Sequence, residues 1–197
     1  SPVLGIVGLM KTQAPVPTEF QQAERAVILL GGAGDCDLTR FGGTQYAKAV
    51  LRDLWGLPPL LDMDYEKRVQ TATREIIAAG LAESSHDLGG GGLAVALAEC
   101  SFGDGQIGAA IQLDSSLRDE FLLYHEAPSR VIITTGDPEA VQAIAAKRGV
   151  DAPRIGTTRP DRLVIENRGK RLIDLPARQL LTAWEGALPA QLGVTAG

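Results

Sequence analysis

Short apolar runs and alternating apolar and polar positions along the chain predict several β-strands. Residues 26–30 form a continuous apolar run, residues 107–113 alternate as a half-buried strand does, and residues 131–135 are again strand-like. A β-like run also occupies residues 3–9 near the start of the chain. Shorter strands are expected in the second half, over residues 154–156, 162–166 and 171–174.

Other segments repeat their apolar residues with helical spacing. The longest predicted helix covers residues 62–79 and stops at Gly80. Its inward face is expected to consist of Val69, Ala72, Ile76 and Ile77. Asp137 followed by Pro138 is typical of a helix start, and Gly149 marks the end of that helix. The remaining helices are expected over residues 44–54, 92–102 and 175–185.

These elements alternate without strict strand–helix–strand repetition. The pattern therefore predicts an α/β (α+β) fold in which a mixed β-sheet is flanked by helices. A chain of 197 residues with 45% hydrophobic residues suits one large domain, or one domain plus an appendage. The chain begins without methionine and runs directly into a strand-like segment, so we expect it to be a piece of a longer protein.

Charge and cysteine content narrow the class of protein. The net charge is −5 and no basic block is present, which argues against a nucleic-acid or membrane-surface partner. No apolar stretch approaches the ~18 residues needed to span a bilayer, and a cytoplasmic location is expected. The two cysteines, Cys36 and Cys100, form no disulfide framework and have no metal-ligand spacing. Cys100 is expected in the core and Cys36 in an exposed loop, with its thiolate disfavoured by flanking aspartates.

The chain holds 23 glycines, and the first cluster follows the predicted strand at 26–30. Gly32 and Gly34 suggest a dinucleotide-binding turn, but the third glycine of that motif would stand at position 37, which is Asp37. A connecting loop is the better interpretation. A weaker alternative is that Asp35 and Asp37 help to hold a metal ion near a phosphate.

A second glycine cluster is the stronger candidate for a binding site. It stands directly before the helix expected from residue 92 and consists of Gly89, Gly90, Gly91 and Gly92. Bare backbone N–H groups at a helix start can converge on an anion. His86 and Asp87 precede this turn and could act in catalysis or orient a substrate. The alternative is a sterically required turn in which Asp87 is a local cap.

Two further loops carry chemistry-bearing residues before a regular element. The first offers an acceptor, a hydroxyl and a guanidinium before the strand at 131–135, from Glu126, Ser129 and Arg130. Such a set can hold a phosphate or ribose hydroxyls, although an ordinary surface loop is an alternative. The second loop precedes a helix and contains Gly42, Gly43 and Thr44. On its own this second loop is a weak signal.

Taken in order, these segments resemble the C-terminal part of the phosphoribosylformylglycinamidine synthase family, within the aminoimidazole ribonucleotide synthetase superfamily. Residues 41–46 are similar to its Leu-Gly-Gly-Ser-x-Tyr loop, and residues 86–93 to its His-Asp-x-Ser-Asp-Gly-Gly-Leu segment. Residues 126–130 are similar to its Glu-Ser-Pro-Ser-Arg segment. Residues 1–9 look like the end of the family's preceding domain, and residues 174–189 like its C-terminal helix. The collinear order is the specific part of this resemblance.

The resemblance implies a fold like the C-terminal domain of aminoimidazole ribonucleotide synthetase. It implies an ATP-dependent ligase of purine biosynthesis that converts formylglycinamide ribonucleotide to the amidine with glutamine-derived ammonia. ATP or ADP and Mg²⁺ would be bound by the full enzyme. The implied partners are its preceding domains, a glutamine amidotransferase subunit, a small accessory subunit and the small-molecule ribonucleotide.

The resemblance also suggests a division of the chain and leaves alternatives open. We expect the end of a preceding domain and a linker over residues 1–20, the synthetase-type domain over 21–189, and a tail over 190–197. Gly89 and Gly90 replace a serine and an acidic residue of the family, so a backbone-only cradle remains there. The isolated piece is expected to be inactive. It could instead be a non-catalytic nucleotide-binding scaffold, or belong to another synthetase or kinase of the superfamily.

Overall fold

A seven-stranded sheet forms the centre of this computed structural model, which describes residues 5, 8 and 15–193. Its strands are β1 (Ala26–Leu30), β2 (Ser84–Asp87), β3 (Ile107–Leu113), β4 (Val131–Thr135), β5 (Arg154–Pro160), β6 (Arg162–Asn167) and β7 (Lys170–Pro176). The order across the sheet is β2-β4-β1-β5-β3-β6-β7. Only β3 and β6 pair in parallel, and the other neighbours are antiparallel. The predicted mixed sheet is confirmed, whereas the strand predicted at 3–9 lies outside the described residues apart from Gly5 and Gly8.

Seven helical segments surround this sheet in the described part of the chain. They are α1 (Leu38–Phe41), the π-helical turn η1 (Ala47–Leu51), α2 (Met63–Ala78), α3 (Gly92–Glu99), α4 (Asp119–Tyr124), α5 (Pro138–Lys147) and α6 (Ala177–Gln191). The predictions of α2 and α5 are confirmed. The helix predicted over 44–54 is shorter, because Arg52 adopts a left-handed conformation directly after η1. The last helix begins and ends later than predicted and continues through Pro189.

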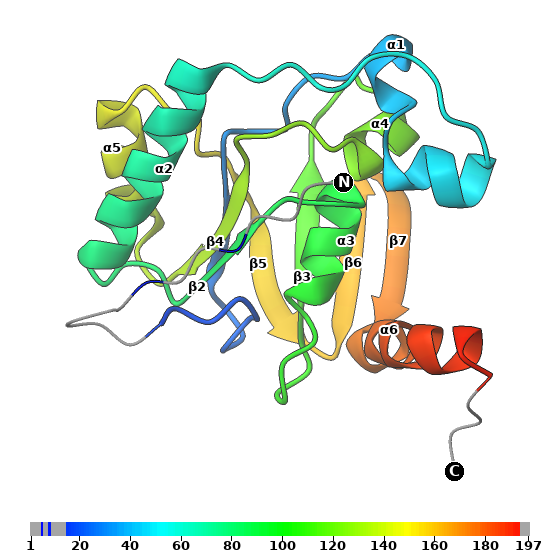
Figure 1. Cartoon of the computed structure of the whole chain (residues 1–197). Helices are drawn as coiled ribbons and strands as arrows, with labels where there is room; N and C mark the ends of the chain where they lie inside the picture. The colour runs from blue at the N-terminus through cyan, green and yellow to red at the C-terminus, as the bar shows by residue number, and fades with distance from the viewer. Residues whose placement is uncertain (1–4, 6–7, 9–14, 194–197) are drawn as a thin grey trace.

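Helices cover both faces of the sheet around β1 (Figure 1). All five β1 residues are buried, and successive side chains enter different cores. Val27 and Leu29 pack in the core that contains α3 and α4. Ala26, Ile28 and Leu30 pack in the core that contains α2 and α5. This two-sided burial explains why β1 is a continuous apolar run rather than an alternating one.

Local capping explains where the two long helices of the second core begin. The Asp62 carboxylate accepts the backbone N–H groups of residues 64 and 65 at the start of α2. Asp137 does the same for Ala140 at the start of α5. Helix α3 is different, because its N-cap is Gly91, which has no side chain to offer. Its start must be completed from elsewhere in the molecule.

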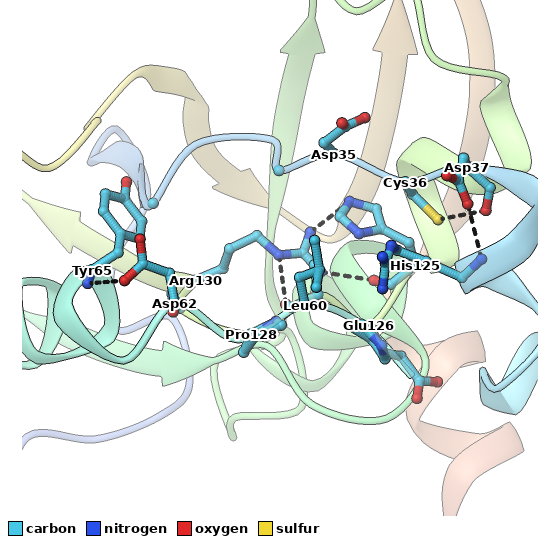
Figure 2. Close-up of a pocket in the computed structure, with 16 residues that line it drawn as sticks. Asp35, Cys36, Asp37, Leu60, Asp62, Tyr65, His125, Glu126, Pro128 and Arg130 are labelled. Carbon is cyan, nitrogen blue, oxygen red and sulfur yellow. Dashed lines mark hydrogen bonds between the residues drawn. The ribbon is translucent and has the colours of Figure 1, made fainter. Parts of the chain in front are cut away.

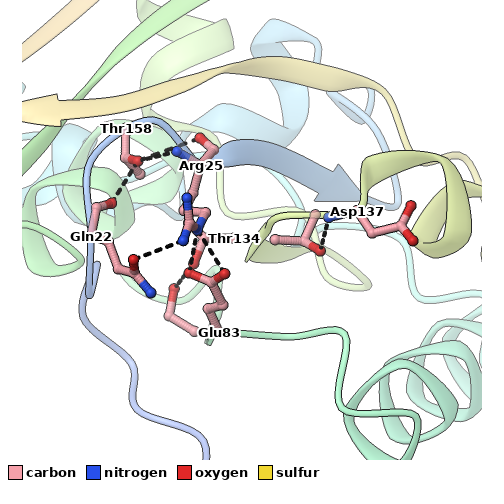
Figure 3. Close-up of polar contacts among 8 residues, drawn as sticks. Gln22, Arg25, Glu83, Thr134, Asp137 and Thr158 are labelled. Atoms are coloured by element: carbon pink, nitrogen blue, oxygen red, sulfur yellow. Dashed lines mark hydrogen bonds and ion pairs between the residues drawn. The ribbon is translucent and has the colours of Figure 1, made fainter.

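Polar contacts attach the segment before β1 to β5 and to the residue that precedes β2 (Figure 3). The Arg25 Nε donates to both Glu83 carboxylate oxygens, at 2.7 and 2.9 Å. Thr158 Oγ1 accepts the Arg25 N–H at 2.8 Å and donates to the Gln22 carbonyl at 2.7 Å. Phe20 is also buried. Residues 20–25 are therefore an integral part of this body of the structure.

Candidate functional site

Glu126 joins three loops that the sequence singles out. Its Oε1 accepts the backbone N–H of Gln45 at 2.7 Å and that of Gly91 at 2.8 Å. The loop after α1, the glycine turn before α3 and the loop before β4 therefore meet at one carboxylate. Gln45 is absent from the residues predicted for the site. Its partner is 81 positions away in the chain, so no local pattern indicates this contact.

The glycine turn presents bare backbone at the surface next to this junction. Gly89 and Gly90 are exposed, as is Gly43 in the neighbouring loop. A side chain added at Gly43 or Gly89 would meet no atom within 4 Å, while one at Gly90 would lie 3.4 Å from the Gln45 side chain. We call these three residues, Gly43, Gly89 and Gly90, the glycine surface. A ligand can approach the backbone closely there.

The other two glycines of the turn, Gly91 and Gly92, have a structural role. Gly91 and Gly92 are buried and have φ angles of +90° and +67°. The Gly91 N–H already binds Glu126, so the protein's own carboxylate stands at the positive end of α3. Only part of the predicted four-glycine cradle thus faces outward.

His86 and Asp87 lie on strand β2, which was not predicted, and not in the turn itself. His86 Nδ1 lies 2.6 Å from the Asp87 carbonyl oxygen, and Nε2 lies 3.5 Å from a Glu99 carboxylate oxygen on α3. The Asp87 side chain lines a groove beside α2. Because neighbouring strand residues point to opposite sides, the structure does not bring these two side chains together on one ligand.

Gly42 and Thr44 shape their loop from within. A Cβ at Gly42 would lie 2.4 Å from the Trp55 ring, so glycine is required for the packing of this tryptophan. Thr44 is buried, and its Oγ1 donates to the Phe41 carbonyl at 2.8 Å and accepts the Ala47 N–H. Both residues position Gly43 and Gln45 rather than face solvent. Trp55 was missed because nothing in the sequence near it marks this contact.

Ser129 and Arg130 face the opposite side of the loop from the glycine surface. Ser129 has a φ of +64°, and its Oγ donates to a Glu66 carboxylate oxygen on α2 at 2.6 Å. Arg130 is 3% exposed and donates from Nε to the Ala127 carbonyl and from Nη2 to the His125 carbonyl, at 3.0 and 2.7 Å. Burial lowers the pKa of Arg130 to about 10, which leaves it charged at neutral pH.

His125, whose role the sequence leaves open, is a buried neighbour of Arg130. Its Nε2 lies 2.8 Å from the Ala33 carbonyl oxygen and 3.1 Å from Arg130 Nη1. The carbonyl can only accept and the guanidinium can only donate, so Nε2 forms a hydrogen bond with one of them at a time. Nδ1 is buried and has no partner among the described residues. Burial, and next the charge of Arg130, lower the pKa of His125 to about 4, so the imidazole is neutral at pH 7.

The prediction that Cys36 is loop-exposed is wrong. Cys36 is buried against Phe41 and Phe121, because the loop after β1 folds under an aromatic cluster. Burial, and next the charges of the flanking aspartates, raise the pKa of its thiol to about 11. The flanking aspartates thus disfavour the nucleophilic thiolate of Cys36 as predicted, and burial has the larger effect. Cys100 is buried, as predicted.

The described residues offer no metal centre of their own. They contain no cluster of three or more His, Cys, Asp or Glu side chains able to hold an ion. Asp37 accepts the Arg40 N–H as the cap of α1. The Mg²⁺ that the resemblance implies does not fit residues of this part of the chain. Among the described residues, none of the helices has both the length and the apolar composition that a membrane span requires.

Known proteins match both the sequence and the fold. Residues 22–166 match the family described as AIR synthase related protein, C-terminal domain. A phosphoribosylformylglycinamidine synthase subunit PurL from Thermoanaerobacter sp. is 36% identical over 191 residues, covering 95% of this chain and 25% of its own length. The Moorella thermoacetica PurL is 37% identical over 193 residues, covering 96% and 26%. The chain thus spans about a quarter of the length of the curated relatives it matches.

Solved structures of a Thermotoga maritima protein have the same fold. PurL complexed with FGAR matches with a TM-score of 0.72 and 21% identity, over 84% of this chain and 29% of that one. PurL complexed with ATP matches with a TM-score of 0.66 and 19% identity, over 84% and 27%. PurLQS matches with a TM-score of 0.62 and 20% identity, over 84% and 27%. At these identities the likeness concerns the fold.

Proposed function

The chain belongs to the family of AIR synthase related proteins, as their C-terminal domain, and from this we propose that it is the C-terminal domain of a PurL-type ligase. The ligase would convert formylglycinamide ribonucleotide to formylglycinamidine ribonucleotide. In this reaction ATP phosphorylates the amide oxygen, and glutamine-derived ammonia then displaces the phosphate. The identity of 36–37% to PurL proteins over nearly the whole chain supports the proposal.

The observation that carries a binding role is the junction at Glu126. By holding Gln45 and Gly91 together, Glu126 aligns two glycine loops into one exposed surface. Phosphate groups bind well where backbone N–H groups are open and no Cβ intervenes. We infer that Gly43, Gly89 and Gly90 form one wall of a site for the phosphate of ATP or of the ribonucleotide. His86 and Asp87 would support that wall from β2. We propose that they have a catalytic role in the complete enzyme.

Exposed apolar side chains follow the Gly43 loop along the chain and suggest where the rest of the enzyme packs. The segment from η1 to the start of α2 exposes Val50, Leu51, Leu54, Leu57, Leu60, Leu61 and Met63. An apolar patch of this kind usually marks an interface. We propose that preceding domains of the same ligase cover it. A glutamine amidotransferase subunit and a small accessory subunit would complete the assembly, and the existence of a PurLQS structure supports such a complex.

Replacement of Gly89 by leucine tests the proposed wall in the full-length enzyme. The added side chain has free space and no strained φ, so the fold should be unchanged. It should block close approach of a phosphate, and we expect kcat/KM to fall about 100-fold, the effect of losing ~3 kcal/mol of binding. Steady-state kinetics with ATP and ribonucleotide provide the measurement.

The matched control is Gly186→Leu on α6, because Gly186 also has free space and lies outside the glycine surface. It should retain the kinetics of the parent. Equal kinetics for both variants and the parent would contradict a catalytic role of the wall. Thermal unfolding of the same variants with and without ADP separates the scaffold alternative, which the occupation of the Gly91 N–H by Glu126 favours. On that alternative, Gly89→Leu abolishes nucleotide-dependent stabilisation while turnover persists.

The 197-residue chain alone is expected to form no detectable amidine from the ribonucleotide, ATP and ammonia. Its described residues supply no cluster for Mg²⁺, and phosphoryl transfer depends on such an ion. Release of ADP and chromatographic detection of the amidine are the measurements. If the purified chain does turn over the ribonucleotide, and the Gly89→Leu variant does not, this domain is catalytically complete on its own.

A further inference from the structure

Arg130 carries a buried positive charge with no carboxylate to neutralise it. Its guanidinium contacts backbone carbonyls and His125, and no Asp or Glu of the described residues lies within 4.0 Å of it. The remaining residues of the chain contain no acidic side chain. Buried charges in proteins are normally paired, since an unpaired one costs several kcal/mol. Within the part of the chain that the structure describes, Arg130 therefore has no carboxylate counter-ion within 4.0 Å.

A pocket of about 250 Å³ opens beside Arg130, between the loop after β1 and the start of α2 (Figure 2). The acidic residues around it do not supply the missing charge. Asp37 and Asp62 accept backbone N–H groups as helix caps. The carboxylates of Asp35 and Glu126 point away from Arg130 in Figure 2.

The shape of the pocket suits a small anion. Gly34 forms a wall without a side chain, and a Cβ there would lie 2.8 Å from His125 Cε1. Arg40 adds a second cation to the lining. The Nη2 of Arg130 uses one of its two N–H groups for the His125 carbonyl, which leaves the other for a ligand.

We propose that this pocket binds a small oxyanion, a phosphate or carboxylate group, whose charge pairs with Arg130. The site is separate from the glycine surface, because none of Gly43, Gly89 and Gly90 lines this pocket, and it does not rest on the proposed ligase activity. Its ligand would stabilise the contact between the loop after β1 and the loop before β4, both of which Arg130 and His125 hold.

Titration of the purified chain with inorganic phosphate and with acetate, at constant ionic strength set with chloride, tests the proposal. We expect millimolar binding of one of them by calorimetry. Arg130→Lys should weaken it at least about tenfold, because the planar fork is lost. Asp35→Asn should tighten it about threefold, because a nearby negative charge is removed from an exposed position.

The control is Asp104→Asn, which removes the same charge from an exposed turn beyond α3 and should leave the affinity unchanged. Stronger binding of phosphate or of acetate identifies which oxyanion group the pocket takes. Absence of binding of both would overturn the proposal. Binding that is identical in the parent and in Asp35→Asn would also overturn it, and this second variant remains informative if Arg130→Lys does not fold.

Discussion

Replacement of Gly92 by alanine should lower the free energy of unfolding by at least about 3 kcal/mol, which for a domain of this size is a fall in Tm of roughly 10 °C. The φ of Gly92 is +67°, and its Cβ would lie 2.6 Å from the His125 carbonyl oxygen and 2.8 Å from the Tyr124 carbonyl carbon. These are backbone atoms of the segment that ends α4, so no side-chain rotation can relieve the clash. Denaturant unfolding of the purified chain measures the effect.

Gly169→Ala is the matched control for that experiment. Gly169 has a φ of +78°, but a Cβ there would meet nothing within 4 Å. Its replacement should cost only the conformational strain, about 1 kcal/mol. The difference between the two variants isolates the close approach of α3 to α4. Equal losses would mean that this approach is not maintained in solution.

The second large effect concerns pH and His125. In the unfolded chain a histidine takes up its proton near pH 6.5, whereas the pKa of His125 in the fold is about 4. Between these values the unfolded state binds more protons, so stability must fall as the pH decreases from 6.5 to 4. The difference between these two pKa values corresponds to about 3 kcal/mol of folding free energy lost by pH 4. Above pH 6.5 the contribution is fully present.

His125→Gln provides the comparison, because a glutamine amide can still donate to the Ala33 carbonyl but does not titrate. Unfolding measured between pH 7 and pH 4 should show a pH dependence about 3 kcal/mol smaller in the variant than in the parent. Burial of the imidazole is the main physical origin of the effect, and the positive charge of Arg130 beside it adds to it. An NMR titration of the folded protein that puts His125 near pH 6.5 would refute this account.

Most of the regular structure could be predicted from the sequence because its causes are local. Apolar periodicity marks α2 and α5, and Asp62 and Asp137 cap them from adjacent positions. Strand β2 escaped prediction because its sequence, Ser-Ser-His-Asp, is polar, and its conformation comes from pairing with β4 at the edge of the sheet. The burial of Cys36 likewise depends on Phe121, which is distant in the chain.

The candidate site was predicted in its parts but not in its arrangement. The loops around Gly43, Gly89 and Glu126 are all recognisable as motifs, yet their meeting at one carboxylate is a tertiary contact. For the same reason the sequence did not indicate that the side chains of His86 and Asp87 point to opposite sides. This follows only from their position on strand β2. Arg130 was predicted as an anion ligand from its neighbours in sequence. The burial of Arg130, which is the physical reason for it to bind an anion, could not be predicted from the sequence.

The cap that Glu126 supplies to α3 also determines when this helix can form. A start at two glycines is unfavourable for helix nucleation, and Gly91 has no side chain to compensate. The missing acceptor arrives from a residue 35 positions later, which itself must meet Gln45 across 81 positions. Contacts of such separation form slowly. We therefore expect helix α3 to form late in folding, and the glycine surface to be assembled only after these distant contacts have formed.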